Sequence, residues 1–552
     1  MVVAGFALVV LVAVALGAAL GFGRPGGATA PAALDPPQFV EEAAAAGIEH
    51  HYDGEFRFFV GGGVAAFDCD DDARPDLYFA GGAEPAALYR NDSPTGGALR
   101  FSARPDPVTD LTDVTGAYPL DVDGDRHTDL VVLRVGENVI LRGLGDCRFE
   151  RANESLGFDG GDAWTAAFSA TWEGDAALPT LAIGNYLVLD EDGGSTFDCH
   201  DNELVRPDAG GDRYAAAVAL SPGWCSLSML FSDWDRSGRR DLRVSNDRHY
   251  YRDGEEQLWR VEAGEPPRLW TRDEGWEQLR IFGMGIASYD LTDDGYPEVY
   301  LTSQADNKLQ TLADVADGRP TFEDMALESG ATAHRPFAGD TTLPSTGWHA
   351  EFQDVNADSF VDLFVAKGNV EAQPDHAARD PSNLLLGQPD GTFVEGAEAA
   401  GLLSFARARG AALVDLNLDG MLDLVVVNRR ENVGLWRNVG WGTAAAPEPM
   451  GNWVALRLDQ PNENHDAIGA WVEVRTGERI MRRELTVGGG HAGGQLGWVS
   501  FGLGSAEDAE VSVRWPDGEV GEWLPLEANR FATIERGASE PAYFTPPAPD
   551  GG

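Results

Sequence analysis

The sequence predicts an all-β protein, with a seven-bladed β-propeller over residues 38–440 and a small β-sandwich over residues 452–537. Three observations lead to this prediction. A short acidic segment recurs along most of the chain, each copy runs into an apolar strand, and the repeats stop at Asn438. Three or four strands in every repeat of about fifty to sixty residues are typical of propeller blades rather than of a solenoid.

The clearest acidic segment reads DLNLDGMLD, from Asp415 to Asp423, and is followed by the apolar run LVVV. Oxygen-bearing side chains stand at positions 1, 3, 5 and 9, Gly420 is at position 6, and position 7 offers a backbone carbonyl. A calcium ion takes about six to eight oxygens, and a tight loop with this spacing can deliver them. The glycine supplies the left-handed turn that folds the loop back. A single copy is equally consistent with a solvated turn, so the assignment as an ion loop depends on whether the segment recurs in the sequence.

Related segments begin at Asp68, Asp121, Asp233, Asp290 and Asp354. The gap after Asp121 is twice the usual length, and residues 165–186 in its middle keep the flanking strands but only WEGD of the loop. The chain therefore has seven repeats, and six of them carry an ion loop. We number these loops by their repeats as one, two, four, five, six and seven. In a ring all six lie on one face, and QFVEE at 38–42 is a candidate to close it.

We expect up to six Ca²⁺ ions, bound through positions 1, 3, 5, 7 and 9 of each loop. The candidate ligands are Asp68, Asp70, Asp72, Arg74 and Asp76; Asp121, Asp123, Asp125, His127 and Asp129; Asp233, Asp235, Ser237, Arg239 and Asp241; Asp290, Thr292, Asp294, Tyr296 and Glu298; Asp354, Asn356, Asp358, Phe360 and Asp362; and Asp415, Asn417, Asp419, Met421 and Asp423.

The charge balance limits the partners. The chain has 41 basic and 90 acidic residues, a formal net charge of −49, which bound calcium would offset only in part. Such a field repels nucleic acid and anionic lipid, so we expect neither as a partner.

The N-terminus predicts a location. Residues 2–23 contain no charged residue and would be long enough as a helix to cross a bilayer. Both a cleaved signal peptide, with Ala28-Thr29-Ala30 as the cleavage site, and a retained membrane anchor fit residues 1–37. In either case we expect the rest of the chain outside the cytoplasm, secreted or anchored.

Four cysteines fit an oxidising compartment. We favour a disulfide between Cys199 and Cys225, which would staple the long segment between repeats three and four. Cys69 and Cys147 read more readily as buried thiols than as a pair.

After Asn438 the pattern changes. Residues 441–451 read as a linker, residues 452–537 as six short strands of a sandwich, and residues 538–552 as a disordered tail. The glycine run at 488–490 and 493–494 lacks the strand-to-helix context of a dinucleotide loop. A flexible loop is the better interpretation.

The C-terminal motifs NHDAIGAWVEV, FGLG and RWPDG occur in the order of an ASPIC/UnbV domain, and the acidic segments resemble FG-GAP or VCBS-type repeats. Together they resemble the cartilage acidic protein-like family. The resemblance implies an FG-GAP-type propeller, secretion, calcium binding and contact with a protein or glycan. Ala73, Arg126 and Ser359 depart from it, because they stand where a glycine is expected.

Propellers host several classes of enzyme, and the fold does not decide among them. We recognise no nucleophile elbow, phosphate loop or zinc-spaced Cys/His cluster in the sequence. We therefore expect a monomeric adhesion or ligand-binding module for a protein or glycan rather than an enzyme. A carbohydrate-active lyase or glycosidase is the alternative.

Overall fold

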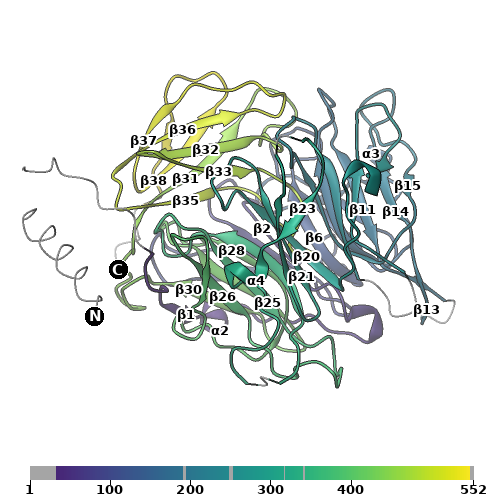
Figure 1. The fold of residues 1–552 in the computed structure, drawn as a ribbon, viewed down its shortest axis with the longest axis horizontal. Coiled ribbons are helices and arrows are strands. Elements are labelled where there is room, and N and C mark those ends of the chain that lie inside the picture. The colour runs from purple at the N-terminus through teal and green to yellow at the C-terminus, as the bar shows by residue number, and fades with distance from the viewer. Residues whose placement is uncertain (1–32, 191–193, 248–252, 316, 340–341, 548–552) are drawn as a thin grey trace, which may run out of the picture.

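The computed structural model describes residues 33–190, 194–247, 253–315, 317–339 and 342–547 (Figure 1). This part of the chain is nearly all β, as predicted. Its helices are about one turn long: α2 (Ala43–Ala46), α3 (Asn153–Leu156), α4 (Ala326–Ser329) and the 3-10 turns η1 (Phe56–Phe58) and η2 (Arg272–Glu274).

Between residues 39 and 438 of the described chain, seven antiparallel sheets of four strands follow one another, and we number them with the repeats. Their strands, in chain order within each sheet, are β2 (Val64–Phe67), β3 (Asp76–Phe79), β4 (Ala87–Asn91), β5 (Phe101–Ala103); β6 (Val114–Leu120), β7 (Asp129–Arg134), β8 (Val139–Gly143), β9 (Phe149–Arg151); β10 (Thr165–Thr171), β11 (Thr180–Asn185), β14 (Asn202–Val205), β15 (Val218–Leu220); β16 (Ser226–Ser232), β17 (Asp241–Asn246), β18 (Gln257–Arg260), β19 (Arg268–Leu269); β20 (Gly283–Tyr289), β21 (Glu298–Ser303), β22 (Lys308–Leu312), β23 (Phe322–Asp324); β24 (Gly347–Gln353), β25 (Asp362–Lys367), β26 (Asn383–Gly387), β27 (Phe393–Glu395); and β28 (Arg407–Val414), β29 (Asp423–Arg429), β30 (Gly434–Asn438) with β1 (Phe39–Glu41).

The first strands of these sheets, β2, β6, β10, β16, β20, β24 and β28, are the inner strands. Each contacts the inner strand of the next sheet, and β28 also contacts β2. Strand β1 pairs with β30, with Phe39 opposite Asn438. The N-terminal segment thus supplies the fourth strand of sheet seven.

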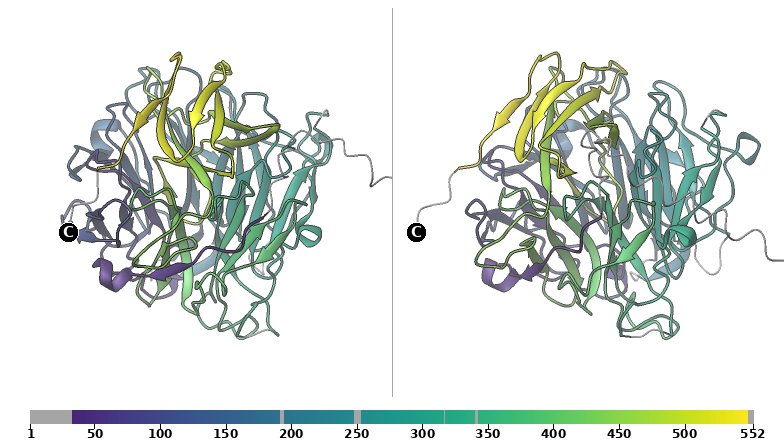
Figure 2. Two further views of the ribbon diagram at one scale, coloured as in Figure 1. Left: turned by 90° about the vertical axis from the view of Figure 1, so that its left-hand side faces the viewer. Right: turned by 60° about the vertical axis from the view of Figure 1, so that its left-hand side comes forward.

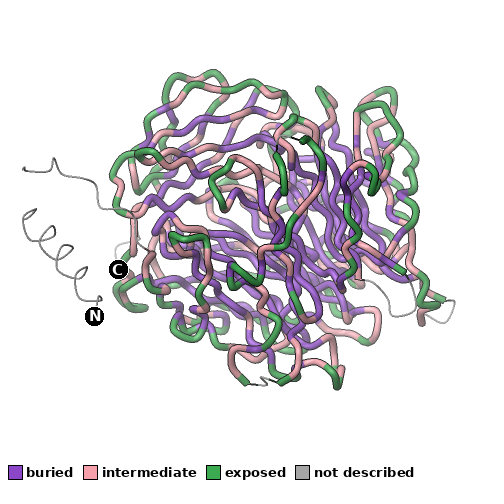
Figure 3. The backbone as a smooth tube through the Cα atoms, in the orientation of Figure 1, coloured by how far each residue is buried: buried purple, intermediate pink, exposed green. Residues whose placement is uncertain are grey.

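Most inner strands consist of small or apolar residues that are buried on both faces, as in VAAF of β2 and TAAFSAT of β10, whereas β24 (GWHAEFQ) is more polar. Figure 3 shows this burial running through the interior, with exposed residues mainly in the connections. The recurrent glycine after the fourth strand also has a structural cause. Gly47, Gly157 and Gly330 end the single-turn helices in the left-handed conformation.

A two-stranded hairpin, β12 (Leu187–Leu189) with β13 (Ser195–Cys199), projects from sheet three. Its Cys199 forms a disulfide with Cys225, across a sequence separation of 26 residues. A second disulfide joins Cys69 to Cys147. The interpretation of these two as free buried thiols is therefore wrong, and the sequence could not show it because they lie 78 residues apart.

The C-terminal residues form two four-stranded sheets, drawn in yellow and yellow-green above the other sheets in Figures 1 and 2. One contains β35 (Val499–Gly504), β31 (Asn452–Asp459), β38 (Arg530–Glu535) and β39 (Ala542–Phe544); the other contains β33 (Arg479–Glu484), β32 (Trp471–Thr476), β36 (Asp508–Arg514) and β37 (Leu524–Glu527). Val454, Val472 and Val511 share the apolar core between them. Strand β39 pairs with β38, so the tail predicted to be disordered is ordered there.

The glycine-rich residues 487–495, called the axial segment, are not a flexible loop as predicted. They leave the C-terminal sheets and lie against the inner strands. The N–H groups of Ala117 and Ala170 donate to the carbonyls of Ala492 and Val487, both at 3.1 Å. Strand β34 (Gly494–Gln495) pairs in parallel with β2.

The axial segment also reaches the inner strands of sheets four to seven. Gly489 N donates to Met229 O and Gly490 N to Ile286 O, both at 2.6 Å. A Cβ on Gly410 would lie 3.0 Å from His491 O, and His349 accepts a hydrogen bond from the N–H of His491 at 3.1 Å. The segment is rich in glycine because seven strands converge on it and leave little room for side chains.

The expectation of a chain anchored in a membrane is corrected. No helix of the described residues is long and apolar enough to cross a membrane. Residues 2–23, on which the expectation rests, lie outside the described residues.

Candidate metal centres

Each of the six predicted loops connects the first and second strands of its sheet, and all six share one backbone conformation. Position 6 is left-handed in every loop, with φ between 71° and 94°. Ala73, Arg126 and Ser359 adopt it although they are not glycine, at a cost of about 1 kcal/mol each. In each loop the N–H of position 6 donates to the aspartate at position 1, at 2.7–3.0 Å. This bond holds the turn closed even where glycine is missing.

The acidic residue at position 9 is an anchor of the loop. In loops one, two, five, six and seven it accepts the backbone N–H of position 2 at 2.7–3.0 Å. In loop seven the other oxygen of Asp423 accepts the N–H of Asn438 at 2.8 Å. Position 1 is also held by backbone N–H groups, so in loops one, two and seven the buried oxygens without a hydrogen-bond partner among the described residues are those of positions 3 and 5.

Position 7 was predicted to contribute a carbonyl. In five loops its N–H donates to the aspartate at position 5, at 2.8–3.0 Å, which orients that carboxylate. The residues concerned are Arg74, His127, Tyr296, Phe360 and Met421.

Loops one and two bring three carboxylates together. The nearest oxygens of Asp68, Asp70 and Asp76 lie within 4.8 Å of one another, and so do those of Asp121, Asp123 and Asp129. Asp70 Oδ1 and Asp123 Oδ1 are buried without a hydrogen-bond partner among the described residues. Burial, with the charges of Asp72 and Asp68, raises the pKa of Asp70 to about 6. A cation would satisfy these oxygens and relieve the repulsion.

Loops six and seven also collect buried acids. Burial, followed by the charge of Asp419, raises the pKa of Asp415 and Asp423 well above the ordinary value. In the described part of the chain, Asp419 Oδ2 and Asn417 Oδ1 are buried and have no hydrogen-bond partner. In loop six, Asp358 Oδ2 already accepts the N–H of Leu34 at 2.7 Å, so loop seven has the freer set of ligands.

In loop four an arginine occupies the place of the cation. The guanidinium of Arg239, predicted to contribute only its carbonyl, lies 2.9 Å from Asp241 Oδ1 and 3.3 Å from Asp235 Oδ2. The indole N–H groups of Trp234 and Trp270 donate to Asp241 Oδ2. The acids of loop four are therefore paired within the protein, and as arranged they do not fit Ca²⁺.

In loop five the guanidinium comes from the C-terminal sheets. Arg482 Nη1 lies 3.1 Å from Asp290 Oδ2, and Glu298 accepts the hydroxyls of Thr292 and Thr311. Loop five thus has one predicted ligand paired with a cationic side chain, although Asp290 Oδ1 has no hydrogen-bond partner in the described chain.

The C-terminal sheets cover the face on which the six loops lie, a contact that the sequence did not reveal. A Cβ on Gly420 would lie 1.8 Å from the ring of Trp453, and one on Gly502 would lie 1.9 Å from Asp354 Oδ2. In the other loops, Arg457 approaches Asp68, His465 contacts Gly124, Glu484 accepts the N–H of Asp233, and Arg482 pairs with Asp290. All six loops therefore lie at an interface within the chain.

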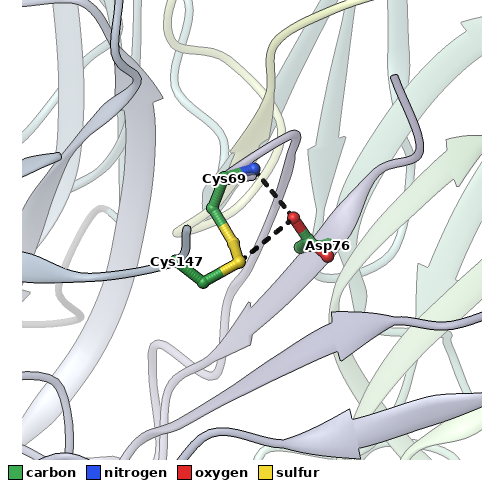
Figure 4. A group of neighbouring side chains, drawn as sticks. All are labelled: Cys69, Asp76 and Cys147. Carbon is green, nitrogen blue, oxygen red and sulfur yellow. Dashed lines mark hydrogen bonds between the residues drawn. A yellow bond between two sulfur atoms is a disulfide. The ribbon is translucent and has the colours of Figure 1, made fainter. Parts of the chain in front are cut away.

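A further group of possible metal ligands is excluded by its chemistry. Cys69, Cys147 and Asp76 lie together beside loop one (Figure 4). The two sulfurs are bonded to each other, so neither is a thiolate that could bind a metal. The disulfide instead fixes Cys69, whose N–H donates to Asp76 Oδ2 at 2.7 Å.

Comparison with known families supports both the repeats and the C-terminal domain. Residues 460–541 match the family described as ASPIC and UnbV, and residues 68–132 and 354–426 match the FG-GAP-like repeat. The chain thus contains FG-GAP-like repeats and an ASPIC/UnbV domain. No curated protein matches the sequence.

Several solved structures resemble the fold. BBS1N, from its complex with ARL6DN, is 12% identical, with a TM-score of 0.41 over 75% of this chain and 99% of that chain. A lectin from Agrocybe aegerita that recognises non-reducing terminal N-acetylglucosamine is 15% identical, with a TM-score of 0.35 over 66% and 88%. The Dos1 propeller is 10% identical, with a TM-score of 0.35 over 74% and 95%. Similarity at this level carries no argument about function.

Proposed function

We propose that the chain is a closed seven-bladed β-propeller, related to the cartilage acidic protein-like family, that binds Ca²⁺ in its loops and serves as a ligand-binding or adhesion module for a protein or glycan. The observation that carries the calcium proposal is the loop geometry. Six loops share one backbone conformation, and their buried carboxylates include oxygens that no described hydrogen-bond donor reaches.

The ions belong in loops one, two, six and seven. In these loops carboxylates or amides stand at positions 1, 3 and 5, and no arginine bridges the acids at positions 3 and 9 as Arg239 does in loop four. Arg74 and Arg142 each pair with a single acid, Asp72 in loop one and Asp123 in loop two. Bound Ca²⁺ would neutralise the clustered charge and draw the side chains of positions 1, 3 and 5 together. In loop four the guanidinium of Arg239 already neutralises the acids at positions 3 and 9, and in loop five Arg482 would have to move away from Asp290. We therefore propose four strong sites rather than six.

The ligand-binding role rests on what the architecture offers. A ring of short sheets presents many connections on rigid strands, a common basis for recognition. The net charge of −49 favours a neutral or cationic ligand over nucleic acid. A carbohydrate-active enzyme is the alternative that the test has to separate.

Two measurements test the proposal. Elemental analysis of the full chain, after dialysis against about 1 mM CaCl₂, should give close to four calcium ions per chain, and no bound calcium would overturn it. Arrays of glycans and proteins should then show binding that chelator weakens. Turnover of a polysaccharide substrate that survives mutation of loops one and seven would instead establish an enzyme.

A further inference from the structure

The four loops proposed to bind Ca²⁺ belong to neighbouring sheets. Sheets six, seven, one and two follow one another, since β24 contacts β28, β28 contacts β2 and β2 contacts β6. In sheets three, four and five, Arg206, Arg239 and Arg482 instead pair with the acids of the loops. Sheet seven is also the sheet that the N-terminal strand β1 completes. The proposed ions therefore lie around the place where the two ends of the repeat region meet.

Three of these loops are bonded to the sheet that follows, and the acceptor is each time the backbone carbonyl of position 2. The bonds run from Asn438 Nδ2 to Val355 O of loop six at 2.9 Å, from Asn91 Nδ2 to Leu416 O of loop seven at 2.7 Å, and from Cys147 N to Cys69 O of loop one at 2.8 Å. The last pair is also joined by a disulfide. The junction of sheets one and two is thus covalent, whereas the two junctions of sheet seven depend on loops six and seven.

The position-2 peptide group lies between two of the proposed ligands, at positions 1 and 3. Its N–H is held by the acid at position 9, as in Val355 N to Asp362 Oδ2 at 2.9 Å and Leu416 N to Asp423 Oδ2 at 3.0 Å. In an empty loop the clustered carboxylates repel one another. A bound ion draws the ligands together and so fixes the peptide group whose carbonyl the next sheet uses.

Asn417, at position 3 of loop seven, connects the ion site to sheet one directly. Its side chain is fully buried, and its Oδ1 has no hydrogen-bond partner among the described residues. Its Nδ2 donates to Gly97 O at 3.0 Å, in the connection between β4 and β5. In the same connection, Gly96 N donates to Asn417 O at 2.9 Å. One side chain can therefore bind the ion with its oxygen and sheet one with its nitrogen.

The N-terminal segment is held by loop six. Leu34 N donates to Asp358 Oδ2 at 2.7 Å, and Leu34 O accepts a hydrogen bond from Asn356 Nδ2 at 3.4 Å. These two residues stand at positions 5 and 3, where ligands are predicted. The segment then enters sheet seven as β1, with Phe39 opposite Asn438. The strand that completes the sheet is thus tied at its start to one of the proposed ion sites.

We propose that calcium fastens the closure of the ring. Ions in loops six and seven hold sheet seven between sheets six and one, and Asn417 is a positioning residue that links the ion of loop seven to sheet one. This inference rests on the calcium binding proposed above. Without calcium the two loops loosen, and strands β1 and β30 become the part of the ring that opens first. Sheets three to five stay closed, because arginines already neutralise the acids of their loops.

Hydrogen exchange of the unaltered full chain, followed by mass spectrometry, tests this proposal. In chelator we expect residues 34–42, 92–101 and 434–438 to exchange roughly tenfold faster than in about 5 mM CaCl₂, while residues 226–246 and 283–303 change by less than about twofold. Equal acceleration in all sheets, or none in a protein that binds calcium, would overturn the proposal. Elemental analysis of the same samples separates these results from a failure of the proposed function, which is a protein without bound calcium.

Two variants test the link through Asn417. Asn417→Asp keeps an oxygen for the ion and replaces the donor that faces Gly97 O. It should bind as many calcium ions as the unaltered protein, but residues 92–101 should lose most of their calcium-dependent protection. Asn356→Asp is the matched control, because it makes the same change at the same position of loop six, where the amide contacts Leu34. It should leave residues 92–101 protected. Full protection of these residues in calcium-loaded Asn417→Asp would refute the link.

Discussion

Asp419→Asn should change stability in a way that depends on calcium. Burial raises the pKa of Asp419 from 3.8 to about 6. The folded chain therefore holds this proton more tightly than the unfolded chain, and folding loses stability as the pH rises between these two values. At pH 7 the full penalty is present and amounts to roughly 3 kcal/mol. Asparagine removes the charge, so in chelator the variant should be more stable than the unaltered protein by up to that amount.

Calcium should cancel this advantage. If loop seven has a dissociation constant of about 0.1 mM, then about 10 mM calcium is a hundredfold excess and stabilises the folded chain by about 2.7 kcal/mol. Asp419→Asn loses most of this gain because one oxygen of the ligand set has lost its charge. The two proteins should therefore have nearly equal stability in calcium.

Urea denaturation followed by tryptophan fluorescence, at pH 7 with either chelator or calcium, measures both differences. Asp175→Asn is the control, because Asp175 is exposed in the degenerate loop of sheet three, and it should change neither value. If Asp419→Asn were less stable than the unaltered protein by the same amount in both solutions, Asp419 would be a structural residue of the turn. The cation proposal for loop seven would then be refuted.

Three other changes are informative. Gly420→Ala and Gly295→Ala should each lower the free energy of unfolding by about 1 kcal/mol, because both glycines have a left-handed φ. Gly420→Ala should cost about 1–3 kcal/mol more, because its Cβ would overlap the indole of Trp453, whereas nothing lies near Gly295. Equal losses of stability in urea would contradict this contact. Replacing Cys199 and Cys225 by serine should lower the free energy of unfolding by about 3–4 kcal/mol, because the unfolded chain is no longer restricted by the disulfide. An unchanged midpoint of urea denaturation would argue against the disulfide. Burial raises the pKa of Glu484 to about 8, so its ionisation destabilises the folded chain as the pH rises from about 4.5 to 8. The melting temperature of Glu484→Gln should therefore rise relative to that of the unaltered protein over this pH range. A difference between the two melting temperatures that does not change with pH would contradict the shift.

The local parts of the fold could be predicted from the sequence. Alternating acids, a turn and an apolar run describe a loop and the strand that comes after it, and this pattern depends only on neighbouring residues. The left-handed backbone at Ala73 and Ser359 shows that the pattern of acids holds the turn when glycine is absent. The aspartate at position 1, which accepts the N–H of position 6, therefore identifies the loop better than the glycine does.

Contacts between distant residues could not be predicted in this way. Arg239 looked like any other residue at position 7, and only its long side chain, folded back to Asp241, removes loop four from the cation sites. Cys69 and Cys147 belong to different sheets, so no local pattern pairs them. The glycine run at 488–490 had the composition of a flexible loop because the strands that hold it lie far away in the chain.

The axial segment affects how the molecule unfolds. Its carbonyls accept the N–H groups of Ala117 and Ala170, and its own N–H groups bond to Met229 and Ile286. Withdrawing it would leave these backbone groups without partners at the place where seven strands meet, which is expensive unless water enters. The two regions that look separable along the chain should therefore melt in a single calorimetric transition, and the axial segment completes a structure whose first strands were synthesised hundreds of residues earlier.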